Sequence, residues 1–371
     1  MTSCSFIHYG HPMAPTPSSN MKTEPTACIL CSRNCGIEVE TDGKSLLKIR
    51  GDRKHPSSSG YLCQKATRLN HYQNHTDRLQ SPLRRKPDGS FEPISWETAI
   101  AEIAAKLLAI RNQHGGRAFA YYGGGGQGNH LGGIYGASLL RAMRSQYHYN
   151  ALAQEKTGDF WVNGKLFGRQ TCHITEGVEQ ADAVIFLGTN PWQAHGIPNA
   201  RETLHKLSKD PDRLMIVIDP RKTETAKLAD IHLAVRPGTD AFLMAAMLAI
   251  LVRDQLVDTD FLEAHTTGSE SLLDTLQSIP IEHFVERAGL SLDRVTQAIH
   301  GFAKASTACV RVDLGIQQSL HSTLNSYLEK LLFLLTGNLG KAGSNNFHTF
   351  LLPLIGHSPE DEKRNWRTVK T

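Results

Sequence analysis

The sequence contains no apolar stretch long enough to cross a lipid bilayer. Its longest apolar run, residues 241–252, falls well short of the ~20 residues that a spanning helix needs, and it predicts a buried helix instead. The first 25 residues have neither a twin arginine nor the apolar core of a signal peptide. Their prolines, serines and threonines predict a disordered leader over residues 1–25. We therefore expect a cytoplasmic protein with no membrane span.

The sequence also has little excess charge of either sign. Its 371 residues include 40 Lys and Arg against 36 Asp and Glu, and the net charge of +4 is too small to indicate a nucleic-acid partner. A basic stretch, residues 78–91, has prolines and an Asp-Gly turn, but no aromatic side chains alternate with its charges to stack on bases. It predicts surface strands or a domain boundary, and the chain is long enough for two or three domains.

Cysteine is sparse, with seven in the chain, yet four of them lie within residues 26–65. Cys28, Cys31, Cys35 and Cys63 have the spacing C-x2-C-x3-C-x27-C, which puts three thiols on one tight loop and returns a fourth from a distance. Such a set suits Zn²⁺ or an iron–sulfur cluster, both of which accept four thiolates. The second short cysteine pair of a structural zinc site is missing, and Lys65 would place a cation beside an anionic cluster. The spacing alone still leaves both metals open. A disulfide framework is the least favoured interpretation, because the chain shows no secretion signal.

Local patterns predict the elements that follow these cysteines. Alternating apolar residues in 37–49, on both sides of an Asp-Gly pair, predict a hairpin that lets Cys63 return to the loop. Ser95 is expected to cap a helix that ends near residue 115. The buried face of that helix is expected to be an apolar stripe formed by Ala99, Ile100, Ile103, Ala104, Leu107 and Leu108.

A glycine-rich segment follows a short predicted strand at residues 118–122. Gly123 to Gly128 matches the pattern G-x-G-x-x-G. A dinucleotide site should also show an acidic residue about 20 positions later, and none stands there. We interpret the segment as a flexible turn.

Buried strands separated by helices predict a parallel sheet in the second half of the chain. Apolar residues at 183–187, 214–218 and 231–235 are each followed by a polar loop, which predicts an α/β, doubly wound (Rossmann-like) arrangement. In such sheets ligands bind beyond the carboxyl ends of the strands. The candidate nucleotide-binding residues in these loops are Gly188, Thr189, Asn190, Pro191, Asp219, Arg221, Thr223, Pro237, Gly238, Thr239 and Asp240.

The side chains of these loops suit a nucleotide. Gly188 allows the backbone to come close to a ligand, and Asn190 can hydrogen-bond a base or a sugar. Asp219 can accept hydrogen bonds from ribose hydroxyls, while Arg221 and Thr223 can hold phosphate oxygens. Three such loops on consecutive strands favour a nucleotide site over ordinary turns.

A last unit is expected after the third loop. It comprises a strand at residues 309–312, a helix from Ser322 and a glycine-rich segment at residues 337–343. The buried face of the helix is predicted to consist of Leu324, Tyr327, Leu328, Leu331, Leu332 and Leu335.

Several motifs together resemble one known family. The cysteine spacing with Cys63-Gln64-Lys65, the loop GTNPWQAH, the stretch IDPRKTETAKLADIHLAVRPGTDA and the segment TGNLGKAGSN are similar to those of molybdopterin oxidoreductases. This is the dimethyl-sulfoxide-reductase superfamily, which includes formate dehydrogenases and nitrate reductases. The resemblance covers residues 26–357.

The resemblance implies two cofactors and the residues that hold them. It implies a [4Fe–4S] cluster on Cys28, Cys31, Cys35 and Cys63, and a molybdenum or tungsten ion held by two pterin guanine dinucleotides. Lys65 would lie between cluster and pterin and help electrons pass, and the three loops would bind the nucleotides. The resemblance further implies a small-molecule substrate and an electron-transfer partner subunit.

The sequence departs from the family pattern in two places. Typical catalytic members carry a further carboxyl-terminal barrel domain, so we expect an amino-terminal portion that ends in a truncated tail, residues 346–371. Members also place a metal ligand near the position of Ala153 and Gln154, where no ordinary ligand stands. Cys172 lies too close to the following strand to serve, and a buried structural role is favoured for it.

These expectations divide the chain into domains and leave three functions open. An iron–sulfur domain is expected over residues 26–80, a second α/β domain over 81–170, and a nucleotide-binding α/β domain over 171–345. The first function is a molybdopterin-dependent oxidoreductase, and the second is an iron–sulfur scaffold of the complex I type without pterin. The third is an NAD-type dehydrogenase with a zinc knuckle. The sequence does not name the substrate, the electron partner or the choice between molybdenum and tungsten.

Overall fold

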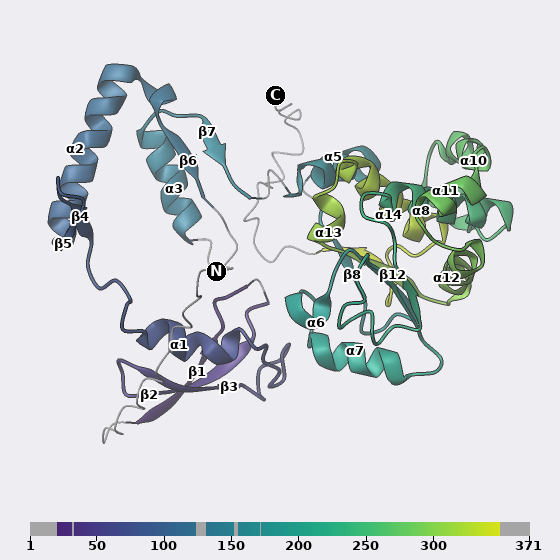
Figure 1. The fold of residues 1–371 in the computed structure, drawn as a ribbon, viewed down its shortest axis with the longest axis horizontal. Coiled ribbons are helices and arrows are strands. Elements are labelled where there is room, and N and C mark those ends of the chain that lie inside the picture. The colour runs from purple at the N-terminus through teal and green to yellow at the C-terminus, as the bar shows by residue number, and fades with distance from the viewer. Residues whose placement is uncertain (1–20, 32, 124–130, 152–154, 171, 349–371) are drawn as a thin grey trace, which may run out of the picture. The chain divides into compact units, whose positions relative to one another are not determined.

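The computed structural model describes residues 21–31, 33–123, 131–151, 155–170 and 172–348. These residues fall into two compact units (Figure 1). The first unit comprises the described residues up to Tyr121 together with residues 131–147. The second unit comprises Tyr122, Gly123 and the described residues from His148 onward. Each unit has its own cluster of buried apolar side chains.

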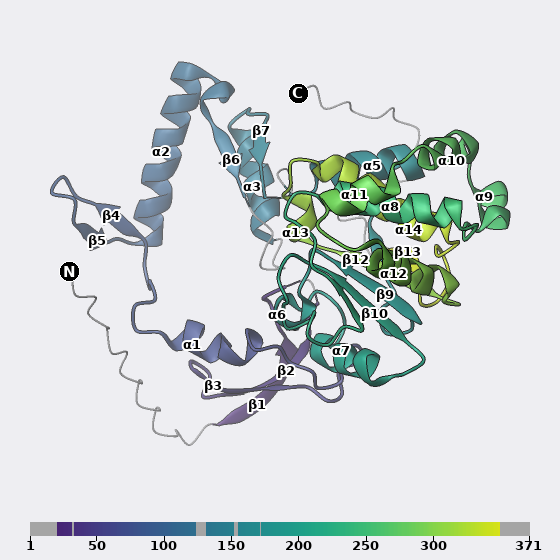
Figure 2. The same cartoon turned by 45° about the vertical axis from the view of Figure 1, so that its right-hand side comes forward.

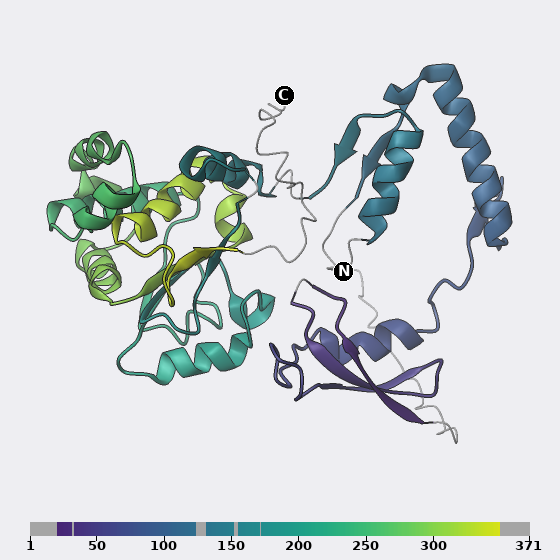
Figure 3. The ribbon, with the colours of Figure 1, turned by 180° about the vertical axis from the view of Figure 1, so that it is seen from behind.

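The first unit begins with a three-stranded antiparallel sheet, drawn in purple and dark blue in Figure 1 and seen from behind in Figure 3. Its strands are β1 (Lys22–Ala27), β2 (Gly36–Thr41) and β3 (Leu46–Gly51), and the helix α1 (Leu69–Asn74) lies against β3. The predicted hairpin between β2 and β3 is confirmed. Asp42 fixes its turn, because Oδ1 accepts the N–H groups of Lys44 and Ser45 at 2.8 and 2.7 Å.

The first strand corrects the expected leader. Residues 22–25 were predicted to be disordered, but they belong to β1 and pair with residues 38–41 of β2. The hairpin edge supplies backbone hydrogen-bond partners that the local composition does not reveal. The remaining leader, residues 1–20, lies outside the described part of the chain.

A second hairpin and a long helix follow in the same unit. Strands β4 (Leu83–Arg85) and β5 (Phe91–Pro93) pair across the expected Asp-Gly turn. Helix α2 (Trp96–His114) begins as predicted, since Ser95 Oγ accepts the N–H of Thr98 at 3.1 Å. The predicted buried stripe of this helix is wrong, however: Ala99 is buried, but Ile100 and Ile103 are 63% and 57% exposed.

The elements after α2 are short. They are the 3-10 helix η2 (Gly116–Ala118), strand β6 (Ala120–Tyr122), helix α3 (Leu131–Ala142) and strand β7 (Tyr147–Tyr149), which pairs with β6. A further 3-10 helix, η1 (Ala66–Arg68), comes directly before α1. The strand predicted over residues 118–122 therefore starts two residues later, because η2 takes its first residue. The segment from Gly123 to Gly128 lies, apart from Gly123, outside the described residues.

The second unit is built on a four-stranded parallel sheet with the order β11-β10-β9-β12 (Figure 2). The strands are β9 (Ala183–Leu187), β10 (Leu214–Ile218), β11 (Ile231–Leu233) and β12 (Ala308–Val312). All four were expected, although β11 ends two residues earlier than predicted. Both Leu214 and Ala308 pair with Ala183, so β9 lies between β10 and β12.

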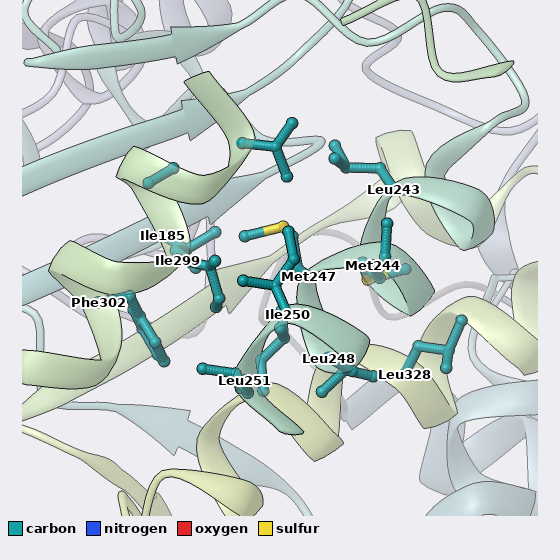
Figure 4. Packing of buried hydrophobic residues seen from close by; sticks show 14 of the residues in the cluster. Ile185, Leu243, Met244, Met247, Leu248, Ile250, Leu251, Ile299, Phe302 and Leu328 are labelled. Carbon is teal, nitrogen blue, oxygen red and sulfur yellow. The ribbon is translucent and has the colours of Figure 1, made fainter. Parts of the chain in front are cut away.

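Helices cover both faces of this sheet, as expected for a doubly wound fold. On one face Ile185 and Leu187 pack with side chains of α8 (Asp240–Arg253), α12 (Leu292–Lys304) and α14 (Ser322–Leu335). On the other face Val184 and Phe186 pack with α7 (Ala200–Lys209). Helix α8 is the predicted buried helix, and Figure 4 shows its apolar side chains among those of the sheet and of α12 and α14.

Smaller elements complete the second unit. They are α5 (Thr157–Phe167), β8 (Ile174–Glu176), α6 (Pro191–Ala194), α9 (Thr259–His265), α10 (Ser269–Gln277), α11 (Ile281–Arg287), α13 (Leu314–Gln317) and β13 (Asn345–Phe347), which pairs with β8. The predicted buried face of α14 is confirmed for Leu328, Leu331, Leu332 and Leu335, whereas Tyr327 is only partly buried and Leu324 is 47% exposed. None of the helices in the described part of the chain combines the length and apolar character that crossing a membrane requires.

Candidate functional site

The cysteine loop of the first unit is closed by its own backbone. The N–H of Cys28 donates to the carbonyl of Cys35 at 2.8 Å, and the N–H of Asn34 donates to the carbonyl of Cys31 at 3.2 Å. Asn34 turns the chain with a φ of 44°, in the left-handed region that Asn tolerates better than most residues. The three thiols therefore stand on one tight turn, as the spacing predicts.

Cys63 reaches this loop at the end of the segment that follows β3. Cys28, Cys35 and Cys63 belong to one apolar cluster, in which Cys28 is buried. Burial is the main reason that the pKa of the Cys28 thiol lies above its ordinary value, and Cys63 and Cys31 raise that pKa further. Burial likewise raises the pKa of Cys35, with added effects of Cys31, Cys28 and Cys63. Each of the four thiols is thus close enough to another to influence its ionisation.

Four thiolates suit either a zinc ion or an iron–sulfur cluster, and the cysteines of this group could serve as ligands for both. Among the described residues, no group of three or more His, Cys, Asp or Glu side chains is already arranged around one metal position. The described cysteines also form no disulfide with one another, which leaves the thiols available as ligands.

Lys65 lies beside this group of thiols. It is exposed and precedes η1, and its positive charge lowers the pKa of Cys28. An ammonium group at this place offsets part of the negative charge that four thiolates would bring together. The structure therefore places Lys65 where the sequence predicts a cation.

The first loop of the second unit, residues 188–191, follows β9 and contacts the backbone of the segment after β12. Gly188 has a φ of +60°, and a Cβ added there would lie 2.8 Å from the backbone nitrogen of Ile316. Its carbonyl accepts the N–H of Gly315 at 3.1 Å. The backbone that comes close to Gly188 thus belongs to the protein itself, whereas the sequence suggested that a ligand would come close there. Thr189 is buried, and Pro191 starts α6.

Asn190 connects the first loop to the second. Its Nδ2 donates to Glu224 at 2.8 Å, and its Oδ1 accepts from the hydroxyl and the N–H of Thr225 at 2.6 and 3.3 Å. The amide oxygen is fully used within the protein, so a nucleotide could engage only the remaining N–H. Asn190 therefore positions the two loops in addition to any contact with a ligand.

The second and third loops bring two carboxylates near each other. Asp219 Oδ1 accepts the N–H of Arg221 at 2.9 Å, and Thr223 Oγ1 accepts the N–H of Ala226 at 3.1 Å. Asp240 is buried at the start of α8, and burial raises its pKa, with a smaller contribution from Asp219.

The rest of these two loops is more open. Arg221 is exposed, as are Pro237 and Gly238. A Cβ added at Gly238 would meet no atom within 4 Å, and Thr239 bonds the carbonyl of Arg236 at 2.6 Å. The predicted loops therefore combine a buried carboxylate, Asp240, and a partly buried one, Asp219, with an exposed cation and an open turn, a mixture suited to sugar hydroxyls and phosphates.

Sequence reasoning missed one part of this site. Strands β9, β10 and β11 follow one another in one direction across the sheet, and β12 then lies on the other side of β9. Ligands of such sheets bind at the point where the strand order reverses, which here is between β9 and β12. The segment after β12 begins with Asp313, which caps α13, and it meets the loop of Gly188. The strand itself was predicted, but no local signal shows which strand it pairs with.

A buried group of charges was also missed. Lys330 of α14 is 2% exposed and donates to Asp159 of α5 at 2.5 Å and to Glu329 at 2.6 Å. Burial alone lowers the pKa of Lys330, but the two carboxylates more than offset this and keep that pKa above its ordinary value. Lys156, just before α5, is also close to these carboxylates, and burial lowers its pKa. This group joins α5 to α14.

The remaining predictions concern the metal ligand. Ala153 and Gln154 lie outside the described residues. Cys172 was expected to be buried, but it is only partly so, and burial raises the pKa of its thiol. Two surface hollows of about 690 and 410 Å³ lie elsewhere and include none of the predicted site residues.

Comparison with known proteins identifies the family. The family described as molybdopterin oxidoreductase matches residues 78–357, and the one described as molybdopterin oxidoreductase Fe4S4 domain matches residues 21–75. The chain therefore belongs to the molybdopterin oxidoreductase family. This membership rules out the third alternative, an NAD-type dehydrogenase with a zinc knuckle.

Individual relatives agree with this assignment. A nitrate reductase of Synechocystis sp. is 29% identical over 353 residues, which cover 88% of this chain and 47% of that protein. Formate dehydrogenase H of Escherichia coli is 28% identical over 335 residues, which cover 88% of this chain and 46% of that protein. The structure of acetylene hydratase from Pelobacter acetylenicus, at 23% identity, has a TM-score of 0.73 over 86% of this chain and 44% of its own, and it shows the same mixed α/β fold. The chain spans about half the length of the curated relatives it matches.

Proposed function

We propose that this chain is the cluster-bearing and nucleotide-binding part of a molybdopterin-dependent oxidoreductase. Cys28, Cys31, Cys35 and Cys63 hold a [4Fe–4S] cluster. The three loops after β9, β10 and β11 bind the guanine dinucleotide ends of a pterin cofactor that carries molybdenum or tungsten. When bound, the cluster supplies one-electron transfer and the metal–pterin group supplies two-electron chemistry on a small-molecule substrate.

The cysteine group is the observation that carries this proposal. Four thiols that influence one another's ionisation lie in the residues that match the Fe4S4 domain. Lys65 adds a cation beside them, and we assign it the role of an electron relay. In the second unit, the loops at the carboxyl ends of β9 and β10 and the segment after β12 meet where ligands of such sheets bind.

The chain's own residues prepare the nucleotide site in definite ways. Asn190 ties the first loop to the second through Glu224 and Thr225. Asp219 orients its own loop through the N–H of Arg221, which leaves the guanidinium of Arg221 exposed for phosphate oxygens. Asp240, buried beside Asp219, offers an acceptor for N–H or hydroxyl donors of the ligand.

One experiment tests the proposal and its alternative. Protein purified without oxygen is expected to be brown and to contain about four iron atoms per chain, because a cubane has four irons. Cys63→Ser is expected to lose most of that iron, since Cys63 is the ligand that returns from a distance. Iron analysis and the visible absorption spectrum check both. A colourless protein with one zinc would contradict the proposal.

Molybdenum, tungsten and pterin analysis of the same sample separates the two remaining functions. Iron together with either metal supports the oxidoreductase, whereas iron alone supports a scaffold of the complex I type. The absence of an ordinary ligand at Ala153 and Gln154 is the observation in favour of the scaffold. Association with an electron-transfer subunit and a cytoplasmic location are further parts of the proposal, the latter supported by unpaired thiols among the described cysteines.

A further inference from the structure

Three residues that bind no metal join the cysteine loop to the segment that returns Cys63. Gly36 follows Cys35 directly. His55 and Ser58 lie in the segment between β3 and Cys63, residues 52–63, which is called the return segment below. The N–H of Gly36 donates to Ser58 Oγ at 3.0 Å in a buried bond, and Ser58 is 4% exposed. The carbonyl of Gly36 accepts the N–H of Asp52 at 3.0 Å. Both backbone groups of Gly36 are therefore bonded to the return segment.

The ring of His55 lies directly against Gly36. A Cβ added at Gly36 would stand 2.4 Å from Cβ and Cγ of His55, so only glycine leaves room for the ring. Nδ1 of His55 accepts the N–H of Ser58 at 3.2 Å and lies 2.9 Å from Ser58 Oγ. Because a backbone N–H can only donate, Nδ1 carries no proton and the ring is in its Nε2–H form. The Ser58 hydroxyl can then donate to Nδ1 while its oxygen accepts from Gly36.

These contacts shorten the effective link between two cluster ligands. Cys35 and Cys63 are separated by 27 residues, and the cost of closing a flexible loop rises with its length. The bonds at Gly36 are made one residue from Cys35, and Tyr61, two residues before Cys63, donates its N–H to the carbonyl of Ser58 at 2.7 Å. Ser58 is thus bonded to both sides of the site.

We propose that His55, Ser58 and Gly36 are positioning residues that hold Cys63 against the cysteine loop at the spacing a cluster requires. This rests on the proposed function, because it assumes that the four cysteines bind iron. Groups that orient metal ligands typically contribute 10–100-fold to metal affinity. We therefore expect these residues to control how firmly the cluster is held, although none of them touches iron.

The test measures the loss of iron to a ferrous chelator from the full chain after anaerobic reconstitution. Ser58→Ala and His55→Ala are expected to lose iron about tenfold faster than the unchanged protein. His55→Asn is expected to restore most of the retention, because its amide oxygen can replace Nδ1 as acceptor. Ser57→Ala is the matched control: its exposed hydroxyl lies 3.4 Å from the same nitrogen, and its iron loss is expected to remain unchanged.

Each outcome decides between the inference and the proposed function. If Ser58→Ala and His55→Ala lose iron at the unchanged rate, the positioning role is wrong while the cluster stands. If the unchanged protein takes up no iron, the proposed function fails instead. The electron paramagnetic resonance spectrum of the reduced cluster provides a second measure, since altered ligand positions change it and a general loss of stability does not. Should Ser58→Ala fail to fold, equal iron loss from His55→Asn and His55→Ala would overturn the inference.

Discussion

Helices α2 and α8 both contain many apolar residues, but only α8 is covered by other elements in the described part of the chain. Met244, Met247 and Leu248 of α8 are 0% exposed, whereas Ile100 and Ile103 of α2 are more than half exposed. The difference lies in their surroundings: α8 packs between a parallel sheet and further helices, and α2 has a single buried residue, Ala99. An apolar stripe predicts a helix, but the neighbours along the fold decide how much of it is buried.

The largest effect is expected from the charges buried between α5 and α14. Lys330→Met is expected to lower the free energy of unfolding of the second unit by about 3–5 kcal/mol, because Asp159 and Glu329 would lose their shared cation inside the protein. Chemical denaturation followed by circular dichroism measures this. Lys304→Met, at an exposed position of α12, is the control and is expected to change little. A similar small change for both variants would show that the buried charges do not stabilise the unit.

A matched pair of substitutions sharpens the comparison of the two helices. Leu248→Ala in α8 is expected to cost about 2–5 kcal/mol, since it removes a fully buried side chain and leaves a cavity. Ile103→Ala in α2, at 57% exposure, is expected to change stability by less than about 0.5 kcal/mol. Thermal and denaturant unfolding of both variants provides the measurement. Equal costs would mean that α2 is covered in solution by something the described residues do not include.

A smaller effect than that of Leu248→Ala is expected at the end of α8. Asp254 accepts bonds from Arg253 and His300 at 2.7 and 2.6 Å, and chiefly the bond from Arg253 lowers its pKa to about 2. A carboxyl group with a lowered pKa in the folded state stabilises the protein above about pH 4, and this contribution is lost as the pH falls toward 2. Since the group is partly exposed and screened by salt, we expect about 1 kcal/mol.

Comparison with Asp254→Asn isolates that contribution. The free energy of unfolding is expected to differ between the two proteins at pH 6, and this difference should shrink as the pH falls below about 4 and be lost only below about pH 2. A constant difference over this range would attribute the effect to packing instead of charge.

Much of the fold could be predicted from local sequence patterns. The hairpin at Asp42, the cap at Ser95 and the strands β9, β10 and β12 are confirmed because each depends on residues close together in the chain. The pairing of residues 22–25 with β2 could not be predicted, since it depends on an edge formed elsewhere.

The candidate site shows the same limit. The cysteine spacing and the loops after β9 to β11 are visible in the sequence, whereas the meeting of Gly188 with Gly315 depends on which strand lies beside β9. The pair of Lys330 and Asp159, 171 residues apart, likewise requires the packing of α5 on α14. The assignment of ligands to the cysteines and loops stays a prediction until metal and nucleotide are measured.

The position of β12 has a consequence for how the protein is made. Strand β9 leaves the ribosome early, but one of its edges pairs with a strand that is synthesised much later: Asp182, just before β9, bonds the N–H of Thr307, 125 residues further along the chain. Contacts between residues so distant in sequence form slowly, and an unpaired parallel edge can associate with other chains in the meantime. The second unit can therefore complete its sheet only after residue 312 has emerged from the ribosome, and until then the edge of β9 that pairs with β12 stays unpaired.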